Sequence, residues 1–473
     1  MTSSNATSPS HTYGASGTPG ASRFYAMAWR WHFYAGLFVV PFLLMLAVTG
    51  LVMVFFTGFQ TRLGTTTYVT PQGQALAVTA QARPVLAQFP AAQLKEYIAP
   101  KTPDVPSWFL MLHDGVTDAV AVNPYTAEVI KVVNKDTTVF AWAEKIHGTL
   151  LLGPTGDYLV EVAAGLGMVM LITGLYLFWP RQLERWSEVL VPHWRATGRK
   201  WWKSLHASLG FWLSLVLSLF LLTGMSWTGV WGAKLVQPWS SFPATKWDAV
   251  PTSDATHATL NSAGLHDVPW GLEQTPLPVS GSQMGTPGVG AGEAVNLDGV
   301  AALAQRLGFT GQYHINVPQD ATGVYSISAD TMSGDLANPF QDRFVHVDRY
   351  TGRILAQAGY ADYAPVAKAM AVGIALHQGD VGLWSACANV LFCLAVVLLC
   401  VSGVAMWWVR RPKGSGRLAA PSVPAQAPLW KGGAVVMLLV AVAFPLAGGV
   451  LLAVLLLDWL VLARVAALKT ALS

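Results

Sequence analysis

Residues 32–50 of the chain read HFYAGLFVVPFLLMLAVTG, and this stretch contains no acidic or basic side chain after its first histidine. The apolar run continues to Phe59, so a helix here is long enough to cross about 30 Å of hydrocarbon at about 1.5 Å per residue. Three further stretches have the same character, and they cover residues 157–179, 205–231 and 382–409. The sequence therefore predicts a membrane protein whose fold is an all-α bundle of four core spans.

The composition agrees with this prediction. Of 473 residues, 53% are hydrophobic and 11% are charged, which differs from the composition of soluble enzymes. The formal net charge of +4 is small, so we expect the lipid bilayer and no nucleic acid as a partner. All three cysteines lie within 382–409, where we expect them to act as small apolar helix residues and to form no disulfide. The first 24 residues lack the pattern of a cleaved signal peptide, and we expect a disordered tail.

A fifth apolar tract lies near the C-terminus, within residues 431–468. As one straight helix it would measure almost 60 Å at about 1.5 Å per residue, which is too long for a simple crossing. Pro445 and the Gly448-Gly449 pair offer a break. A kinked span and a helical hairpin both remain open.

Basic residues in short loops predict the orientation of the spans. They gather in segments 182–202 and 412–430, where they include Arg195, Arg199, Lys200, Lys413 and Arg417. These loops are therefore expected in the cytoplasm. The long segments 60–146 and 233–376 then lie outside, in the periplasm if the cell has two membranes.

The chain repeats its own pattern, which shows what the architecture needs twice. Residues 206–224 read HASLGFWLSLVLSLFLLTG, with the same histidine, glycine and Thr-Gly spacing as residues 32–50. The second and fourth spans match through Thr173-Gly174 and Ser402-Gly403, and each span follows a histidine, His147 or His377. We therefore expect one unit, used twice in parallel orientation.

The external segments repeat as well, because NPYTAEVI at 123–130 corresponds to DRYTGRIL at 348–355. Asn, Asp and Gly at such points are typical of a turn between two strands. Upstream we expect helices near 79–89 and 297–307, and strands near 107–113 and 323–329. Each external module is thus α+β, whereas residues 240–295 are rich in Gly, Pro, Ser and Thr and predict an extended loop of unassigned fold.

The predicted organisation, in chain order, is a disordered cytoplasmic tail (1–24), span 1 (25–59), external module 1 (60–146), span 2 with an interfacial lead-in (147–181), a cytoplasmic loop (182–202), span 3 (203–232), external module 2 with the extended loop (233–376), span 4 (377–411), a cytoplasmic loop (412–430) and the C-terminal span or hairpin (431–468).

Two histidines stand at matched depth at the cytoplasmic start of spans 1 and 3. His32 and His206 are each followed four residues later by a glycine, Gly36 or Gly210, which leaves room for a flat macrocycle near the backbone. Imidazoles from two facing helices are a standard way to hold b-type haem iron in a bundle. This pair is our first candidate haem site.

His147 and His377 form the second candidate pair. We expect them on amphipathic helices over 139–151 and 364–377, lying at the outer interface before spans 2 and 4. One haem near each face would make a path for electrons across the membrane. A single histidine at a helix end is more often a cap or an interfacial residue, but recurrence in both halves and at both faces favours ligands.

Two acidic residues in the outer part of the second span have two interpretations. Glu161 within a span would usually have a partner or move a proton, whereas Glu161 and Asp157 together could cap a helix near the interface. The remaining histidines are expected to be surface or domain residues; among them, His257 and His266 could contact a substrate. No nicotinamide or flavin fingerprint occurs, so electrons would come from a quinol or a separate flavoprotein.

The chain resembles the PepSY-associated transmembrane family from about residue 28 to 465. The resemblance rests on the motifs LFVVPFLLMLAVTGL (37–51) after His32, HGTLLLG (147–153) followed by Gly156-Asp157, TGLYLFWPR (173–181), LHASLG (205–210) and SGVAMWWVRR (402–411). Known members include bacterial inner-membrane reductases that reduce ferric siderophores on the periplasmic side with two membrane haems. Carried over to this chain, the resemblance implies that His32, His206, His147 and His377 hold two haem b groups, and that the external modules are PepSY-like.

The resemblance implies a haem-dependent ferric-chelate reductase of the bacterial inner membrane that takes part in iron uptake. Its acceptor would be a ferric siderophore or another ferric chelate, and no catalytic residue is assigned. The competing interpretation is a membrane-anchored regulatory or binding protein without redox activity, because PepSY modules are also associated with restraint of peptidases. A transporter is a third possibility suggested by the repeat, but the spans lack the broken helices that transport requires.

Overall fold

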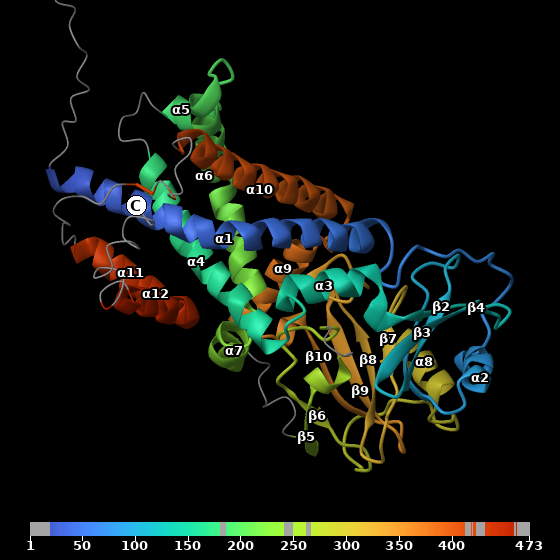
Figure 1. Cartoon of the computed structure of the whole chain (residues 1–473). Helices are drawn as coiled ribbons and strands as arrows, with labels where there is room; N and C mark the ends of the chain where they lie inside the picture. Colours follow the sequence, from blue (N-terminus) through green and yellow to red (C-terminus); the bar gives the residue numbers. More distant parts are fainter. Residues whose placement is uncertain are drawn as a thin grey trace, which may run out of the picture.

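The computed structural model describes residues 19–179, 186–240, 249–261, 266–411, 418, 420–421, 431–457 and 460 (Figure 1). A bundle of long helices occupies one side of the molecule, and a large β-sheet domain lies at one end of this bundle. We call the end of the bundle next to the sheet the sheet-side end and the opposite end the distal end. The all-α bundle predicted for the spans is confirmed in this coarse form.

In the part of the chain that the structure describes, four helices are long and apolar enough to cross a membrane, as predicted. They are α1 (Pro19–Phe59), α4 (Pro154–Phe178), α6 (Gly198–Met225) and α10 (Leu383–Arg410). Their shared core contains Val39, Leu43, Val169, Leu221 and Val396, whereas many large apolar side chains on the outside of the bundle are exposed, as expected where lipid replaces water. Helix α1 begins at Pro19, so residues 19–24 are helical and the predicted disordered tail extended too far. Residues 1–18 lie outside the described residues.

Helix α6 ends earlier than the predicted third span. The sequence predicted apolar helix to residue 231, but α6 stops at Met225 and the chain restarts as a π-helical turn over Trp231–Val236, followed by α7 (Gln237–Ser240). The break is stabilised from outside the helix, because the Trp270 indole donates to the Ser226 carbonyl at 2.6 Å. Hydropathy cannot report such a contact, since it comes from a distant segment.

Over residues 431–457, the described part of the C-terminal tract, the chain forms two successive helices and does not turn back as a hairpin at Pro445. Helices α11 (Lys431–Ala443) and α12 (Pro445–Leu457) follow one another in nearly the same direction (Figure 1). Hydrogen bonds continue across the proline, from Phe444 N to Val440 O and from Gly448 N to Phe444 O, both 2.9 Å. The tract packs on α4, where Gly165 faces Ala447 so closely that a Cβ on the glycine would lie 2.7 Å from the alanine Cβ.

The two segments that were predicted to lie outside the membrane form one antiparallel sheet, whose described strands follow the order β10-β9-β8-β7-β1-β2-β3-β4. The first segment contributes β1 (Gln93–Ile98), β2 (Ser107–His113), β3 (Val116–Val122) and β4 (Val129–Asn134). The second contributes β7 (His314–Asn316), β8 (Val324–Ala329), β9 (Arg343–Asp348) and β10 (Ile354–Gly359). The predicted strands at 107–113 and 323–329 and both predicted turns are confirmed. The pairing of β1 with β7, which joins the two modules, was not predicted.

Helices cover one face of this sheet and an irregular segment covers part of the other. Helices α2 (Val78–Gln88) and α8 (Leu297–Arg306), both predicted, pack over a core that includes Val85, Phe109, Ile315 and Val347. Against the opposite face lies part of the predicted loop 240–295, including β5 (Thr252–Thr256), a 3-10 turn (His257–Leu260) and β6 (Pro276–Pro278). Val268, Trp270 and Leu272 of this segment are buried, so it packs as part of the domain.

Two short helices connect the sheet to the bundle. Helix α3 (Val139–Thr149) precedes α4, and α9 (Pro365–Gln378) precedes α10, as the sequence predicted. Each ends at a residue with left-handed backbone, Leu150 with φ 52° and Gly379 with φ 82°. These turns reverse the chain into the following span, so the last turn of each short helix lies against the bundle.

Candidate functional site

The structure brings the four predicted histidines together in two pairs. The His32 and His206 rings have centres 6.3 Å apart and planes at 82°. The His147 and His377 rings have centres 6.4 Å apart and planes at 79°. The first pair lies toward the distal end of the bundle and the second at the sheet-side end, so we call them the distal pair and the sheet-side pair.

Each distal histidine is anchored through Nδ1 to a neighbouring span. His32 Nδ1 lies 3.2 Å from Thr173 Oγ1 and 3.0 Å from the Met170 carbonyl oxygen. His206 Nδ1 lies 2.9 Å from Ser402 Oγ and 3.2 Å from the Leu399 carbonyl oxygen. In both cases the hydroxyl residue and the carbonyl residue are one helical turn apart, on α4 or on α10.

The sheet-side pair repeats this arrangement on the other two spans. His147 Nδ1 is 2.9 Å from Thr49 Oγ1 on α1, and His377 Nδ1 is 2.8 Å from Thr223 Oγ1 on α6. The carbonyl groups of Leu46 and Phe220 complete the two contacts. Every span of the repeat therefore receives one histidine at a Thr or Ser hydroxyl.

The hydrogen-bond network assigns the same tautomer to all four rings. Each hydroxyl donates its own hydrogen to a carbonyl within its helix, at 2.7 or 2.8 Å. The hydroxyl oxygens must then accept from the imidazoles, so the hydrogen lies on Nδ1. Nε2 is left with a lone pair, which is the state that binds a metal while the other nitrogen orients the ring.

A glycine follows each of these hydroxyl residues and makes room for the ring. A Cβ atom on Gly174 would lie 2.9 Å from His32 Cε1, and one on Gly403 would lie 3.3 Å from His206 Cε1. The corresponding distances are 3.4 Å for Gly224 to His377 and 3.9 Å for Gly50 to His147. The sequence showed these Thr-Gly and Ser-Gly pairs as a repeat without giving their role; their fourfold occurrence was the available signal.

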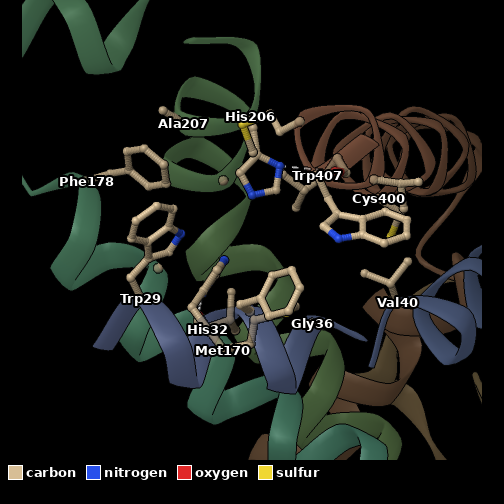
Figure 2. A pocket seen from close by; sticks show the side chains of 18 of the residues that line it. Trp29, His32, Gly36, Val40, Met170, Phe178, His206, Ala207, Cys400 and Trp407 are labelled. Carbon is tan, nitrogen blue, oxygen red and sulfur yellow. Dashed lines mark hydrogen bonds between the residues drawn. The ribbon is translucent and has the colours of Figure 1, made fainter. Parts of the chain in front are cut away.

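A cavity surrounds the distal pair (Figure 2). Its volume is about 230 Å³, and it is lined by residues of all four spans. In Figure 2 the ring nitrogens of His32 and His206 point toward each other across this space. Gly36 and Gly210 also line the cavity. Apart from the two histidines, the strongly polar lining residues are Arg199 and Arg410, and the rest of the wall is largely apolar or aromatic.

The ring spacing fits one metal ion between two imidazoles. A metal–nitrogen bond of about 2.0 Å, with each nitrogen about 1.2 Å from its ring centre, separates two opposed rings by about 6.4 Å. Both pairs have this separation. With two imidazoles anchored through Nδ1 in each pair and an apolar cavity around one pair, the residues present are suited to holding the iron of a haem.

Aromatic side chains lie beside the sheet-side pair on one flank. The Phe220 ring stacks on the His377 ring with centres 4.5 Å apart, and Phe392 contacts Phe220 at 4.3 Å. In the alignment of the repeat, Leu46 occupies the position of Phe220. The two halves of the site are therefore similar in their ligands but differ in their packing.

The two acidic residues of the second span act as caps in the structure. Glu161 Oε2 accepts from the Val230 and Trp231 amides at 3.1 and 3.2 Å, and Asp157 Oδ2 accepts from the Gly229 amide at 2.7 Å. These amides lie where the chain restarts after the α6 break, so the carboxylates satisfy otherwise unpaired donors. Neither residue lines the distal cavity.

Three histidines that were expected at the surface or simply within a domain are buried against the sheet. His257 and His346 face one another with Nε2 atoms 2.9 Å apart, and burial lowers the pKa of His257 to about 4. His314 lies between Glu96 at 2.6 Å and Asp335 at 3.0 Å, and these carboxylates raise its pKa well above the usual value despite burial. His266 is paired with Glu273 at 2.7 Å. Within the described ranges, no three His, Cys, Asp or Glu side chains converge as metal ligands.

The spans and the paired histidines define a polytopic membrane protein with a single sheet domain at one end of its bundle. The chain matches the family model of the PepSY-associated TM region over residues 29–410, and it belongs to this family. A comparison with curated proteins gives no match. The resemblance to ferric-siderophore reductases stays a prediction.

Proposed function

We propose that the protein holds two haem b groups, one at each histidine pair, and conducts electrons across the membrane. The observation that carries the proposal is the spacing of the two pairs, 6.3 and 6.4 Å, together with four Nδ1 anchors of the same kind. When bound, haem b supplies reversible one-electron chemistry. The residues of the chain would bind and orient the haem.

The protein residues have distinct tasks in this proposal. The four Nε2 atoms would hold the haem irons, and the Thr and Ser hydroxyls fix the ring orientations. The largely apolar wall around the distal pair keeps water away and favours a flat hydrophobic ligand. His32 and Thr49, which anchors His147, lie about 17 residues apart on α1, or roughly 25 Å at 1.5 Å per residue. The two sites are thus near opposite ends of one span.

The direction of electron flow follows from the expected orientation. Basic residues flank the distal end, so this end is expected in the cytoplasm and the sheet domain outside, in the periplasm of a bacterial inner membrane. Electrons from a quinol or a flavoprotein would enter at the distal pair and leave at the sheet-side pair.

The acceptor that we propose is a ferric chelate such as a ferric siderophore, with iron as substrate. Support for this choice comes from the family resemblance. One electron converts ferric to ferrous iron, and the ferrous ion binds hard-oxygen chelators much less tightly, so reduction releases it.

Haem quantitation of the purified protein and of single-histidine variants tests the proposal. We expect a low-spin b-type spectrum with two haems per chain. His206→Ala and His377→Ala should each retain one haem, while His193→Ala, at an exposed histidine outside both pairs, should retain two. A protein expressed with ample haem that shows no Soret band, or variants that all match the control, would overturn it.

A further inference from the structure

The distal cavity has one charged end. Among the described residues that line it, only Arg199 and Arg410 carry a permanent charge, and none is a carboxylate. Arg199 belongs to the first turn of α6 and Arg410 is the last residue of α10. Both residues therefore stand nearer the distal end of the bundle than His206 and Gly403 do on the same helices.

Helix geometry places the two arginines on the faces that form the site. Arg199 precedes His206 by seven residues, and Arg410 follows Gly403, which contacts the His206 ring, by seven residues. Residues seven apart lie on one helix face two turns away, about 10 Å along the axis. Each arginine thus stands about 10 Å beyond a residue at the level of the histidine pair, a distance that a long side chain can partly span.

The walls of the cavity hold the Arg410 guanidinium in position. Its central carbon lies 5.1 Å from the centre of the Trp29 ring and 5.6 Å from the centre of the Phe33 ring, and both aromatic residues line the same cavity. The two arginines are also close enough to repel each other electrostatically. An anion bound between them would relieve this repulsion and gain charge-assisted hydrogen bonds.

We propose that Arg199 and Arg410 bind the two propionate carboxylates of the haem held by His32 and His206, with the carboxylate edge directed toward the distal end. The inference rests on the proposed function and adds the orientation of the ligand. Haem b has an apolar macrocycle with both carboxylates on one edge. The cavity has the matching distribution, with imidazoles at its centre, apolar and aromatic side chains around them and two cations at one end.

The test compares haem with its dimethyl ester, in which the carboxylates carry no charge. Full-length protein from haem-limited cells is titrated with each, and the bis-imidazole spectrum reports binding at the distal pair in a His377→Ala background. With both arginines unaltered, the protein should bind haem about tenfold or more tightly than the ester, because charge-assisted hydrogen bonds usually contribute that much to affinity. Arg199→Gln with Arg410→Gln should abolish the preference, and Lys substitutions should restore part of it.

Matched controls separate this role from a general basic surface. Lys200→Gln and Arg411→Gln remove neighbouring positive charges that do not line the cavity, and they should leave the preference unchanged. The arginine variants should also lower the midpoint potential of the distal haem, because less positive charge nearby favours the ferric state. If both ligands bind equally to the unaltered arginines, or the controls act like the arginine variants, the inference is wrong. If no bis-imidazole spectrum forms at all, the proposed function itself fails.

Discussion

The histidine pairs of the bundle and the histidine pair behind the sheet differ in one measurable way. Ring centres are 6.3 and 6.4 Å apart in the bundle, but 4.9 Å apart for His257 and His346. At the shorter distance the two Nε2 atoms are 2.9 Å apart, so one imidazole donates directly to the other. In the bundle the ring centres have the separation expected for two imidazoles that share one metal ion.

This difference shows that spacing, and not the anchoring of Nδ1, distinguishes the two regions. His257 Nδ1 contacts the Thr275 carbonyl oxygen at 2.7 Å, and His346 Nδ1 contacts Ser326 Oγ at 2.9 Å, much as in the bundle. His257 and His346 hydrogen-bond to each other, and both line a small cavity behind the sheet. The bundle pairs are held apart by four helices, each of which carries a Thr or Ser followed by Gly.

The largest expected effect comes from removing the histidines themselves. His32→Ala with His206→Ala should reduce the haem content from the proposed two to one per chain, because both histidines that would hold iron at the distal site are lost. His257→Ala with His346→Ala should leave two haems and instead destabilise the sheet domain, since buried polar contacts and volume are lost. Pyridine haemochrome assays and thermal unfolding of detergent-purified protein measure both effects. If only the His257→Ala, His346→Ala variant lost haem, the haem site would have to be assigned to the sheet domain and not to the bundle.

Removing one anchor should have the next largest effect. Thr173→Val keeps the shape of the side chain but deprives His32 Nδ1 of its hydroxyl acceptor. Loss of such a contact behind a metal ligand typically weakens metal binding about 10–100-fold. Transfer of haem to an excess of apomyoglobin should therefore be faster from the distal site. Thr57→Val is the control, because Thr57 lies on the same helix as His32 and contacts the Gln378 carbonyl instead.

A smaller effect is expected from filling the space at the glycines. A Cβ at Gly174 would lie 2.9 Å from His32, whereas one at Gly50 would lie 3.9 Å from His147. Gly174→Ala should displace the ring and weaken haem binding by about 1–3 kcal/mol, the usual cost of overpacking. Gly50→Ala should be nearly neutral at its own site. Equal retention of both haems in the two variants would show that the glycines do not set ring position.

Much of this architecture follows from local sequence patterns. The spans were predicted from uninterrupted apolar runs, and the strands at 107–113 and 323–329 from their flanking turns. The pairing of His32 with His206 was expected because the repeat places both residues at equal depth. The position of a residue along an apolar span can be counted from the sequence. Two residues at the same position in two repeated spans are therefore expected at the same depth in the membrane.

Contacts between distant segments could not be predicted in the same way. The role of Thr173-Gly174 depends on how α4 is rotated toward α1, and no local pattern fixes that rotation. The end of α6 at Met225 depends on Trp270, Asp157 and Glu161, which belong to other segments. The joining of the two modules through β1 and β7 involves only three residue pairs. Each of these features depends on which distant segments contact one another, and a single sequence does not determine that.

The smallest predicted effect concerns the junction of the modules, where His314 of β7 contacts Glu96 of β1. Glu96 and Asp335 raise the pKa of His314 well above that of an unfolded chain. A raised pKa means that its contribution to stability is complete below about pH 6.5 and declines as pH rises through the folded value. His314→Gln should remove this decline, which for one group cannot exceed about 1.4 kcal/mol per pH unit. Unfolding curves of both proteins between pH 6 and pH 9 give the difference directly.

A histidine of the bundle provides the control, because His32→Gln should change the haem content but leave the pH dependence of unfolding unchanged. A difference between the unchanged chain and His314→Gln that stays constant with pH would mean that His314 is neutral in the folded domain, and that the two modules are joined by backbone pairing and packing without help from its charge.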